Sequence, residues 1–385
     1  MPERTSVLMV VGLAPPYHSG AGKQAADLAQ EIVRRGRAVE LLTTAPGARR
    51  PRREKLGNVS VWRVPVSIAG SRRDKALFSL ALAMRLLSRP RRYRVVHLHG
   101  SYYLLRTLTR LKSLLGLRIV YKATMCGKDD AATIARHRGR VLVDAVDRWV
   151  CIAEPIAAAT ASAGVGAHAI ERLRNAIDVR RFYPGRVEDR ARLRERLGLP
   201  DGAAVWASVG TLSPRKGFHL LVQAWAELPT PRPTLLLVGP DTDDRAREAP
   251  EYARRVERLI ADLGLDGSAR LLGAESDVAG LLRGLDGFLF ASEHEGLPNA
   301  VLEALACGLP VLSTRFEAAA DVVALAEGRA RFVAADPAAF AAAIADVPAP
   351  GDVPDAIRAL DIEAIVDRYL DLYAELSREA GRGHV

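Results

Sequence analysis

The first half of the chain alternates short apolar runs with amphipathic segments. An apolar run at 6–12 precedes a loop that we expect to extend through Gly22, and apolar residues then recur at helical spacing over 23–36. Strands joined through helices form a parallel sheet, so this half predicts one doubly wound α/β domain. Its further strand-length runs lie at 38–44, 59–66, 93–100, 118–124 and 148–153.

The second half repeats this alternation. The segment 173–202 that links the halves is rich in charge, and we place the domain boundary near Pro184. The predicted fold class is α/β, with Rossmann-like doubly wound domains at 1–184 and 185–360. A final helix within 361–385 is amphipathic, and we expect it to pack back on the first domain. The strand-length runs of the second half lie at 204–210, 234–239, 269–273, 287–292 and 310–314.

Charged residues are distributed unevenly between the two halves of the chain. Up to Pro184 there are 33 Lys and Arg residues against 13 Asp and Glu, and beyond it 22 against 32. The basic residues cluster in the runs 49–55, 71–75 and 89–94. Such clusters attract anionic partners, and we expect an anionic membrane surface here and no nucleic acid. A general excess of arginine in the composition is the alternative explanation.

The cysteines and the hydropathy of the chain indicate the cellular compartment in which we expect the protein. Cys126, Cys151 and Cys307 are scattered and form no CxxC pair, which suggests a reducing compartment and no structural zinc. No apolar run approaches the roughly 18 residues of a membrane span, and the N-terminal run is too short for a secretory signal. We expect a cytoplasmic protein that needs no metal, at most peripheral on the inner face of the plasma membrane.

Two of the predicted strands end in polar loops. Arg215 and Lys216 follow the strand that ends at Gly210, and two carboxylates follow the strand at 287–292. Ligands of open α/β sheets bind beyond such strand ends, where cations and a helix N-terminus hold phosphates and carboxylates accept hydroxyls. The combination fits a nucleoside diphosphate sugar, whereas the cations alone would be more typical of an exposed basic turn. The second loop and its helix contain Glu295, Gly296, Leu297, Pro298, Asn299 and Glu303.

These residues also carry a family resemblance. "PRKG" at 214–217 and "EHEGLPNAVLEALACGLPV" at 293–311 resemble the C-terminal domain of the retaining GT-B glycosyltransferases of family GT4. The signature of that family is a Glu, seven residues and a second Glu, here Glu295 and Glu303. Weaker likenesses lie at 19–43, 94–100 and 173–184.

The resemblance implies roles for individual residues. Lys216, with Arg215, would bind the donor pyrophosphate, Glu303 would hold the ribose, and Glu295 would contact the transferred sugar. Backbone amides from Gly296 to Asn299 would face the sugar and phosphates. Glycine would let the chain approach the donor closely at three positions. These are Gly20, Gly22 and Gly210.

Two departures from the family pattern affect this interpretation. Relatives commonly have Arg where this chain has Thr211, and many have His where it has Thr124 or Met125. We expect His99 to be the catalytic candidate of the first domain and to face away from a structural His97. The acceptor-side candidates are Lys128, Asp129 and Asp130. The two aspartates could equally cap a helix that starts at residue 131.

We therefore expect a retaining, metal-independent hexosyltransferase. Its donor would be a nucleoside diphosphate sugar, with UDP favoured over GDP, and its catalytic group would comprise Lys216, Arg215, Glu295 and His99. The expected acceptor is a glycan or glycolipid of lipid-linked, lipopolysaccharide or exopolysaccharide synthesis. A small-molecule glycosyltransferase and a catalytically silent protein that binds a sugar nucleotide remain alternatives.

Overall fold

The computed structural model describes residues 6–47, 53–67, 71–90, 92–241 and 249–382. The chain divides into two compact units, unit 1 with residues 1–176 and 362–385 and unit 2 with residues 177–361. Residues 49–52 and Arg91, which belong to the predicted basic runs, lie outside the described residues.

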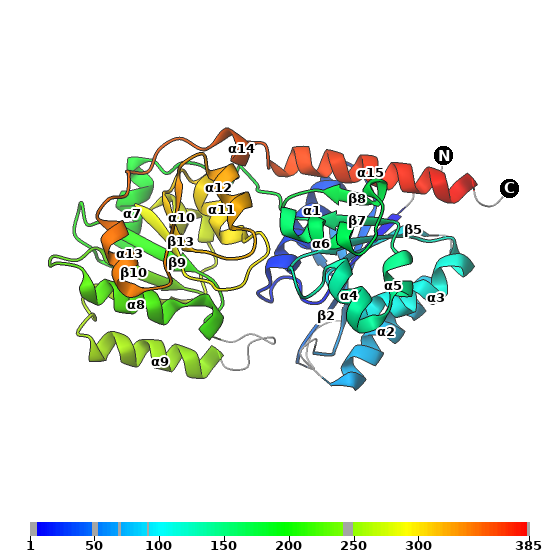
Figure 1. Ribbon diagram of the computed structural model, residues 1–385, viewed down its shortest axis with the longest axis horizontal. Helices are drawn as coiled ribbons and strands as arrows, with labels where there is room; N and C mark the ends of the chain where they lie inside the picture. Colours follow the sequence, from blue (N-terminus) through cyan, green and yellow to red (C-terminus); the bar gives the residue numbers. More distant parts are fainter. Residues whose placement is uncertain (1–5, 48–52, 68–70, 91, 242–248, 383–385) are drawn as a thin grey trace. The chain divides into compact units, whose positions relative to one another are not determined.

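Unit 1 is built on an eight-stranded sheet with the order β3-β4-β2-β1-β5-β6-β7-β8, in which only β3 and β4 pair antiparallel. Helices α1 and α15 cover one face of it, and α2 and α3 lie on the other side (Figure 1). The strands are β1 (Ser6–Val11), β2 (Val39–Thr44), β3 (Arg53–Leu56), β4 (Val59–Val64), β5 (Tyr93–His99), β6 (Arg118–Ala123), β7 (Arg148–Cys151) and β8 (Ile170–Arg172). The helices are α1 (Gly20–Arg34), α2 (Arg72–Leu87), η1 (Tyr102–Leu104), α3 (Leu105–Leu115), α4 (Ala131–Arg138), α5 (Arg140–Asp144), α6 (Glu154–Ser162), η2 (Ala167–Ala169) and α15 (Ile362–Arg382).

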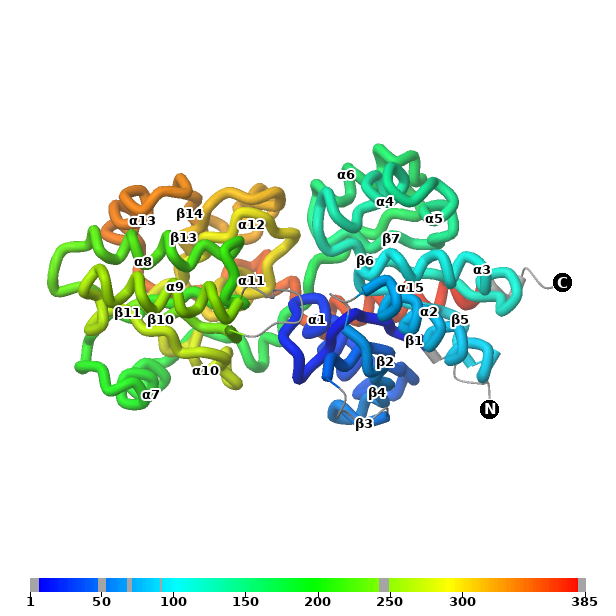
Figure 2. The backbone as a smooth tube through the Cα atoms, turned by 90° about the horizontal axis from the view of Figure 1, so that it is seen from below, coloured from blue at the N-terminus to red at the C-terminus, as the bar shows by residue number. Residues whose placement is uncertain are grey.

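Unit 2 carries a six-stranded parallel sheet with the order β11-β10-β9-β12-β13-β14. Its core fills the face covered by α8, α9 and α13, and α11 and α12 lie on the opposite side (Figures 1 and 2). The strands are β9 (Val205–Val209), β10 (Thr234–Val238), β11 (Ala269–Gly273), β12 (Gly287–Phe290), β13 (Val311–Thr314) and β14 (Ala330–Val333). The helices are α7 (Val187–Leu197), η3 (Pro214–Lys216), α8 (Phe218–Glu227), α9 (Ala249–Asp262), α10 (Val278–Arg283), α11 (Asn299–Ala306), α12 (Ala319–Ala326), α13 (Pro337–Ile344) and α14 (Asp355–Arg358).

The boundary between the units lies at Ala176, ahead of the predicted Pro184. Hydrogen bonds explain the difference. The Gln24 side chain of α1 donates to the Ala176 carbonyl at 2.8 Å and accepts from its amide at 2.9 Å. The next residue, Ile177, instead donates to the Leu360 carbonyl at 2.9 Å and forms a bridge with Asp361, so the chain changes units between these two residues.

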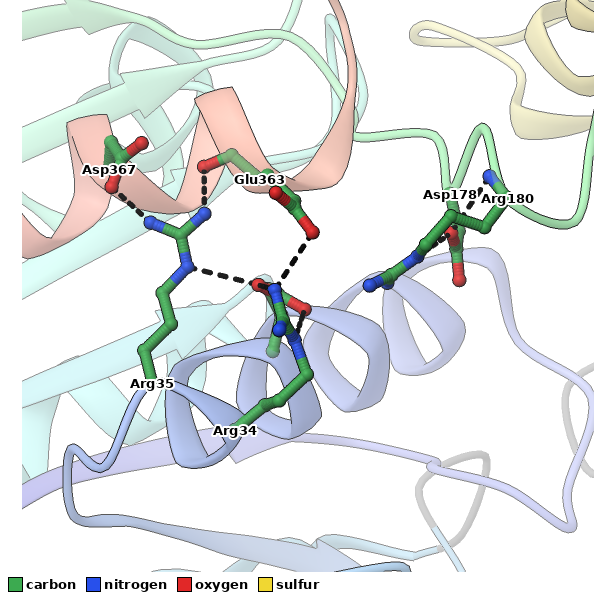
Figure 3. Close-up of polar contacts among 7 residues, drawn as sticks. Arg34, Arg35, Asp178, Arg180, Glu363 and Asp367 are labelled. Carbon is green, nitrogen blue, oxygen red and sulfur yellow. Dashed lines mark hydrogen bonds and ion pairs between the residues drawn. The ribbon is translucent and has the colours of Figure 1, made fainter.

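Ion pairs and hydrogen bonds (Figure 3), together with apolar packing, hold α15 against α1. The buried carboxylate of Glu31 accepts hydrogen bonds from Arg34 at 2.6 Å and from Arg35 at 2.9 Å. The same two guanidinium groups reach α15, where Arg34 pairs with Glu363 at 2.8 Å and Arg35 pairs with Asp367. Acidic residues of α15 thus pair with basic residues at the C-terminal end of α1 within unit 1.

Candidate functional site

The candidate site of unit 2 lies where its strand order reverses. Strand β9 has β10 on one side and β12 on the other, so the chain leaves β9 and β12 in opposite directions along the sheet. This is the topological switch point at which open α/β sheets bind ligands. The loop after β9 ends in η3, and the loop after β12 leads into α11. The two predicted polar loops are therefore neighbours in space.

The predicted cations and the first predicted carboxylate meet at this point. Glu295 Oε1 accepts hydrogen bonds from Lys216 Nζ at 2.7 Å and from an Arg215 guanidinium nitrogen at 2.5 Å. The Lys216 side chain is 16% exposed and that of Glu295 is 11% exposed, whereas Arg215 is 39% exposed. The ammonium group of Lys216 also lies 5.0 Å from the centre of the Phe290 ring. The arrangement is a largely buried carboxylate held by two cations.

Burial and charge act on these groups in opposite ways. Burial would raise the pKa of the Glu295 carboxyl, but Lys216 and Arg215 outweigh it and hold that pKa below its ordinary value. Burial lowers the pKa of the Lys216 ammonium, Arg215 lowers it further, and the pair with Glu295 opposes both effects. Since Glu295 and Lys216 each stabilise the charged form of the other, either group left alone would be costly to keep charged.

Two residues of the site were not predicted. Ser292 Oγ donates to Glu295 Oε1 at 2.7 Å, and the Glu317 carboxylate accepts from the Glu295 amide at 3.1 Å and contacts His294 Nδ1 at 2.9 Å. A signal for both existed in the sequence, because Ser292 follows β12 and Glu317 follows β13 at the same edge of the sheet.

The remaining donor-side predictions fall close by. Asn299 is the first residue of α11, Pro298 occupies its N-cap, and Gly296 and Leu297 are buried in the preceding loop. Glu303 is 7% exposed within α11. A Cβ on Gly210 would lie 3.3 Å from Lys216 Cε, so glycine there leaves room for the lysine side chain.

Gly20 and Gly22 lie in unit 1, and they are part of a helix where a loop was predicted. Helix α1 begins at Gly20, and Ser19 caps it by accepting from the Gly22 amide at 3.2 Å. A Cβ on Gly22 would lie 1.8 Å from the Leu13 carbonyl oxygen. Close packing of α1 against the chain after β1 therefore requires this glycine, and contact of either glycine with a donor stays a prediction.

The expectation that His97 and His99 face opposite ways is wrong. Residues two apart on a strand point to the same face, and these rings lie 4.1 Å apart between centroids. Burial and the neighbouring Lys122 hold the pKa of both imidazoles well below the ordinary value. His97 Nδ1 contacts the Tyr373 hydroxyl at 2.7 Å, whereas both nitrogens of His99 are buried without a hydrogen-bond partner among the described residues. This geometry lends no support to a catalytic His99.

The predicted acceptor-side residues divide into two kinds. Asp130 is the N-cap of α4 and accepts from the Thr133 amide at 2.9 Å, which is the capping alternative left open above. Asp129 accepts from the Thr124 and Met125 amides at 2.9 and 2.8 Å. Lys128 is exposed at the surface.

Neither a membrane-spanning helix nor a cluster of metal ligands occurs within the described ranges. No described helix has both the length and the apolar composition needed to cross a bilayer. No three His, Cys, Asp or Glu side chains gather there in a way that could hold a metal ion.

Comparisons with known proteins support the family. The model described as "Glycosyltransferase Family 4" matches residues 18–181, and the model "Glycosyl transferases group 1" matches residues 189–353. The chain is 33% identical over 190 residues to the lipopolysaccharide core biosynthesis glycosyltransferase LpsE of Rhizobium meliloti (strain 1021). That alignment covers 47% of this chain and 53% of LpsE. The chain spans between 43% and 66% of the length of the first curated relatives that it matches.

Solved structures confirm the predicted fold. Sucrose-phosphate synthase from Thermosynechococcus elongatus matches with a TM-score of 0.79 at 19% identity, over 97% of this chain and 99% of that one. HepE of Anabaena in complex with UDP-glucose matches with a TM-score of 0.66 at 19% identity, over 98% of each chain. The structural matches show the GT-B fold, and the two family models, which together match residues 18–181 and 189–353, identify the chain as a member of glycosyltransferase family 4, a family of transferases.

Proposed function

We propose that this protein transfers a hexose from a nucleoside diphosphate sugar to an acceptor hydroxyl. One observation carries the proposal, namely that Lys216 and Arg215 converge on Glu295 at the β9–β12 switch point, beside the N-terminus of α11. Two cations and a helix N-terminus suit a diphosphate, and carboxylates suit the hydroxyls at either end of it.

Glu295 forms ion pairs with both Arg215 and Lys216. An incoming diphosphate would compete for Lys216 and Arg215 with more negative charge than one carboxylate carries. Its binding would release Glu295 to accept hydrogen bonds from the sugar hydroxyls. Glu303, a little over one turn into α11, would accept from the ribose diol. The HepE complex contains UDP-glucose. We propose that the donor of this protein is likewise a UDP-sugar, with a GDP-sugar as the second choice.

The chemical step needs stabilisation of the departing diphosphate as the bond from C1 to its oxygen breaks. Lys216, Arg215 and the amides at the start of α11 would supply this electrostatically, and we propose that no metal is required. Glu295 is a poor candidate for a covalent nucleophile because, in this proposal, its carboxylate accepts hydrogen bonds from the hydroxyls of the transferred sugar. We therefore propose retention by attack on the same face, in which the acceptor proton passes to the leaving phosphate.

We also propose that the acceptor is lipid-linked and that the protein docks on an anionic bilayer. One face of α2 exposes Leu77, Leu80, Met84 and Leu87, which are between 40% and 56% exposed and three or four residues apart. Arg72, Arg73 and Lys75 lie exposed at the start of the same helix. An apolar stripe flanked by cations suits an anionic lipid surface.

Vesicle flotation tests the docking. Wild-type protein should float with anionic vesicles and not with neutral ones, and the L80E/M84E variant should lose this binding. V323E, which changes a residue that is 51% exposed in unit 2, is the matched control. Equal recovery of wild-type protein with both kinds of vesicle would contradict the proposal, and a soluble acceptor would then be favoured.

A donor panel tests the transferase function. UDP- and GDP-hexoses are screened by thermal shift, and hits are incubated with candidate acceptors while nucleotide and glycoside products are followed. Release of nucleoside diphosphate together with an α-linked product from an α-linked donor supports the proposal. Binding of a donor without turnover on any acceptor would instead favour a silent sugar-nucleotide-binding protein.

A further inference from the structure

Unit 1 contains a cavity that the donor site does not explain. It has a volume of about 190 Å³ and lies beyond the carboxyl ends of β5 and β6, between η1 and α4. Adjacent parallel strands deliver their loops to this edge of the sheet, which is where such sheets bind ligands. The lining residues are Tyr102, Lys128, Thr133, Ile134, His137 and Arg138.

Three of the lining residues carry a positive charge or can acquire one. Arg138 lies over the ring of Tyr102 at 5.5 Å and donates to its hydroxyl at 3.3 Å. Within the described part of the chain, no carboxylate forms an ion pair with Lys128, His137 or Arg138. Many other basic residues of unit 1 do form such pairs, for example Lys112 with Asp147 at 2.9 Å and Arg140 with Asp144 at 2.6 Å. The basic side chains at this cavity are therefore not ion-paired among the described residues. Lys128 does act on its neighbour Asp129, because burial raises the pKa of that carboxyl and the charge of Lys128 offsets part of the rise.

The nearest carboxylates are occupied elsewhere. Asp129 accepts from two backbone amides and from the Thr124 hydroxyl at 2.7 Å. Asp130 accepts from the Gly127 amide at 2.6 Å and from the Thr133 amide and hydroxyl. These bonds fix the loop and the start of α4 and direct both negative charges to the backbone. The two aspartates thus support the walls of the cavity without forming an ion pair with its basic side chains.

We propose that this cavity binds a phosphate group of the acceptor, through Lys128, His137 and Arg138. The inference rests on the proposed transferase function and names the chemical class of its acceptor. A guanidinium group offers a planar fork for phosphate oxygens, and Lys128 adds a point charge. The volume is below the roughly 300 Å³ of sites that hold a whole small ligand, so the cavity suits one charged group and leaves the rest of the acceptor outside.

The first test measures phosphate binding without donor. Glycerol 3-phosphate is titrated into the full chain while the imidazole resonance of His137, assigned with H137Q, is followed by NMR. We expect a saturable shift in wild-type protein and binding about tenfold weaker in R138Q and in K128Q. R136Q removes a charge from the same helix outside the cavity and should bind as wild type does. Because no donor is present, failure of the transferase proposal leaves this result unaffected.

The second test identifies the source of the phosphate. Vesicles that contain phosphatidic acid present the same group on a bilayer, and R138Q is compared with R136Q in both arms. A larger loss by R138Q supports the site, and the arm with tighter wild-type binding shows whether the phosphate comes from a soluble or a lipid acceptor. Wild-type affinity of R138Q and K128Q in both arms, or an unmoved His137 resonance, would overturn the proposal.

Discussion

Lys122 offers a prediction that depends only on the fold. It lies on β6, is 2% exposed, and its ammonium nitrogen has no hydrogen-bond partner among the described residues. Its surroundings are His97, His99 and the ring of Tyr369, whose centre lies 5.9 Å away. Burial lowers the pKa of Lys122 from 10.5 to about 7. The K122M variant keeps the length of the side chain and removes the charge.

The sign and size of the effect follow from linkage. Between pH 7 and pH 10.5 the unfolded chain holds a proton on Lys122 that the folded chain releases, so stability falls as the pH falls through this window and stays low beneath it. A pKa difference of about 3.5 corresponds to about 5 kcal/mol, and about 4 kcal/mol of this cost applies at pH 7. K122M should therefore raise the free energy of unfolding of unit 1 by about 4 kcal/mol at pH 7 and by much less near pH 10.5.

Urea unfolding read by pulsed amide exchange of β5 and β6 peptides isolates unit 1 from unit 2. K55M, which removes an exposed lysine on β3, should change stability by less than about 0.5 kcal/mol. If K122M is neutral or destabilising, or if its gain is the same at pH 7 and pH 10, then Lys122 does not carry an uncompensated buried charge.

Three further predictions concern local features. G22A should lower the melting temperature of unit 1 by an amount equivalent to about 2 kcal/mol or more, because the added methyl would overlap the Leu13 carbonyl, and calorimetry would measure it. D130A should cost about 1 kcal/mol and increase amide exchange in α4 without changing donor binding, and unchanged exchange would refute its role as N-cap. R35M removes hydrogen bonds to the Glu363 carbonyl and Asp367, and should speed amide exchange at the start of α15 about threefold or more while R37M does not.

Much of the fold was readable from apolar runs because its central strands are buried on both faces. The strands missed, β3, β8 and β14, are short and lie at or next to sheet edges, and the sequence "REKL" of β3 has no apolar pattern at all. Edge strands bury little side-chain surface, so pairing with β4 determines β3 more than its own composition does. The position of the unit boundary was also not predictable from local sequence. Ala176 is held in unit 1 by the side chain of Gln24, which is remote from it in sequence.

The residues of the proposed donor site could be predicted from the sequence, but the contacts between them could not. Strand ends identified Lys216 and Glu295, but their direct pairing depends on β9 and β12 being neighbours, which is a property of the sheet order. Ser292 and Glu317 follow the same rule and were overlooked. The assignment of His99 relied on strand alternation applied to residues two apart, where it places both histidines on one face.

The most direct test of the account is the affinity for the donor that the panel selects, measured by calorimetry on wild-type, K216M and E303A proteins whose melting curves show intact folding. We predict that K216M and E303A each weaken donor binding at least about tenfold and lose turnover, because each removes a charge-assisted contact to the diphosphate or the ribose. R232M, which changes an arginine of unit 2 that donates to the Ala226 carbonyl, is the control and should bind normally. Wild-type affinity and turnover in both K216M and E303A would contradict the assignment of the site.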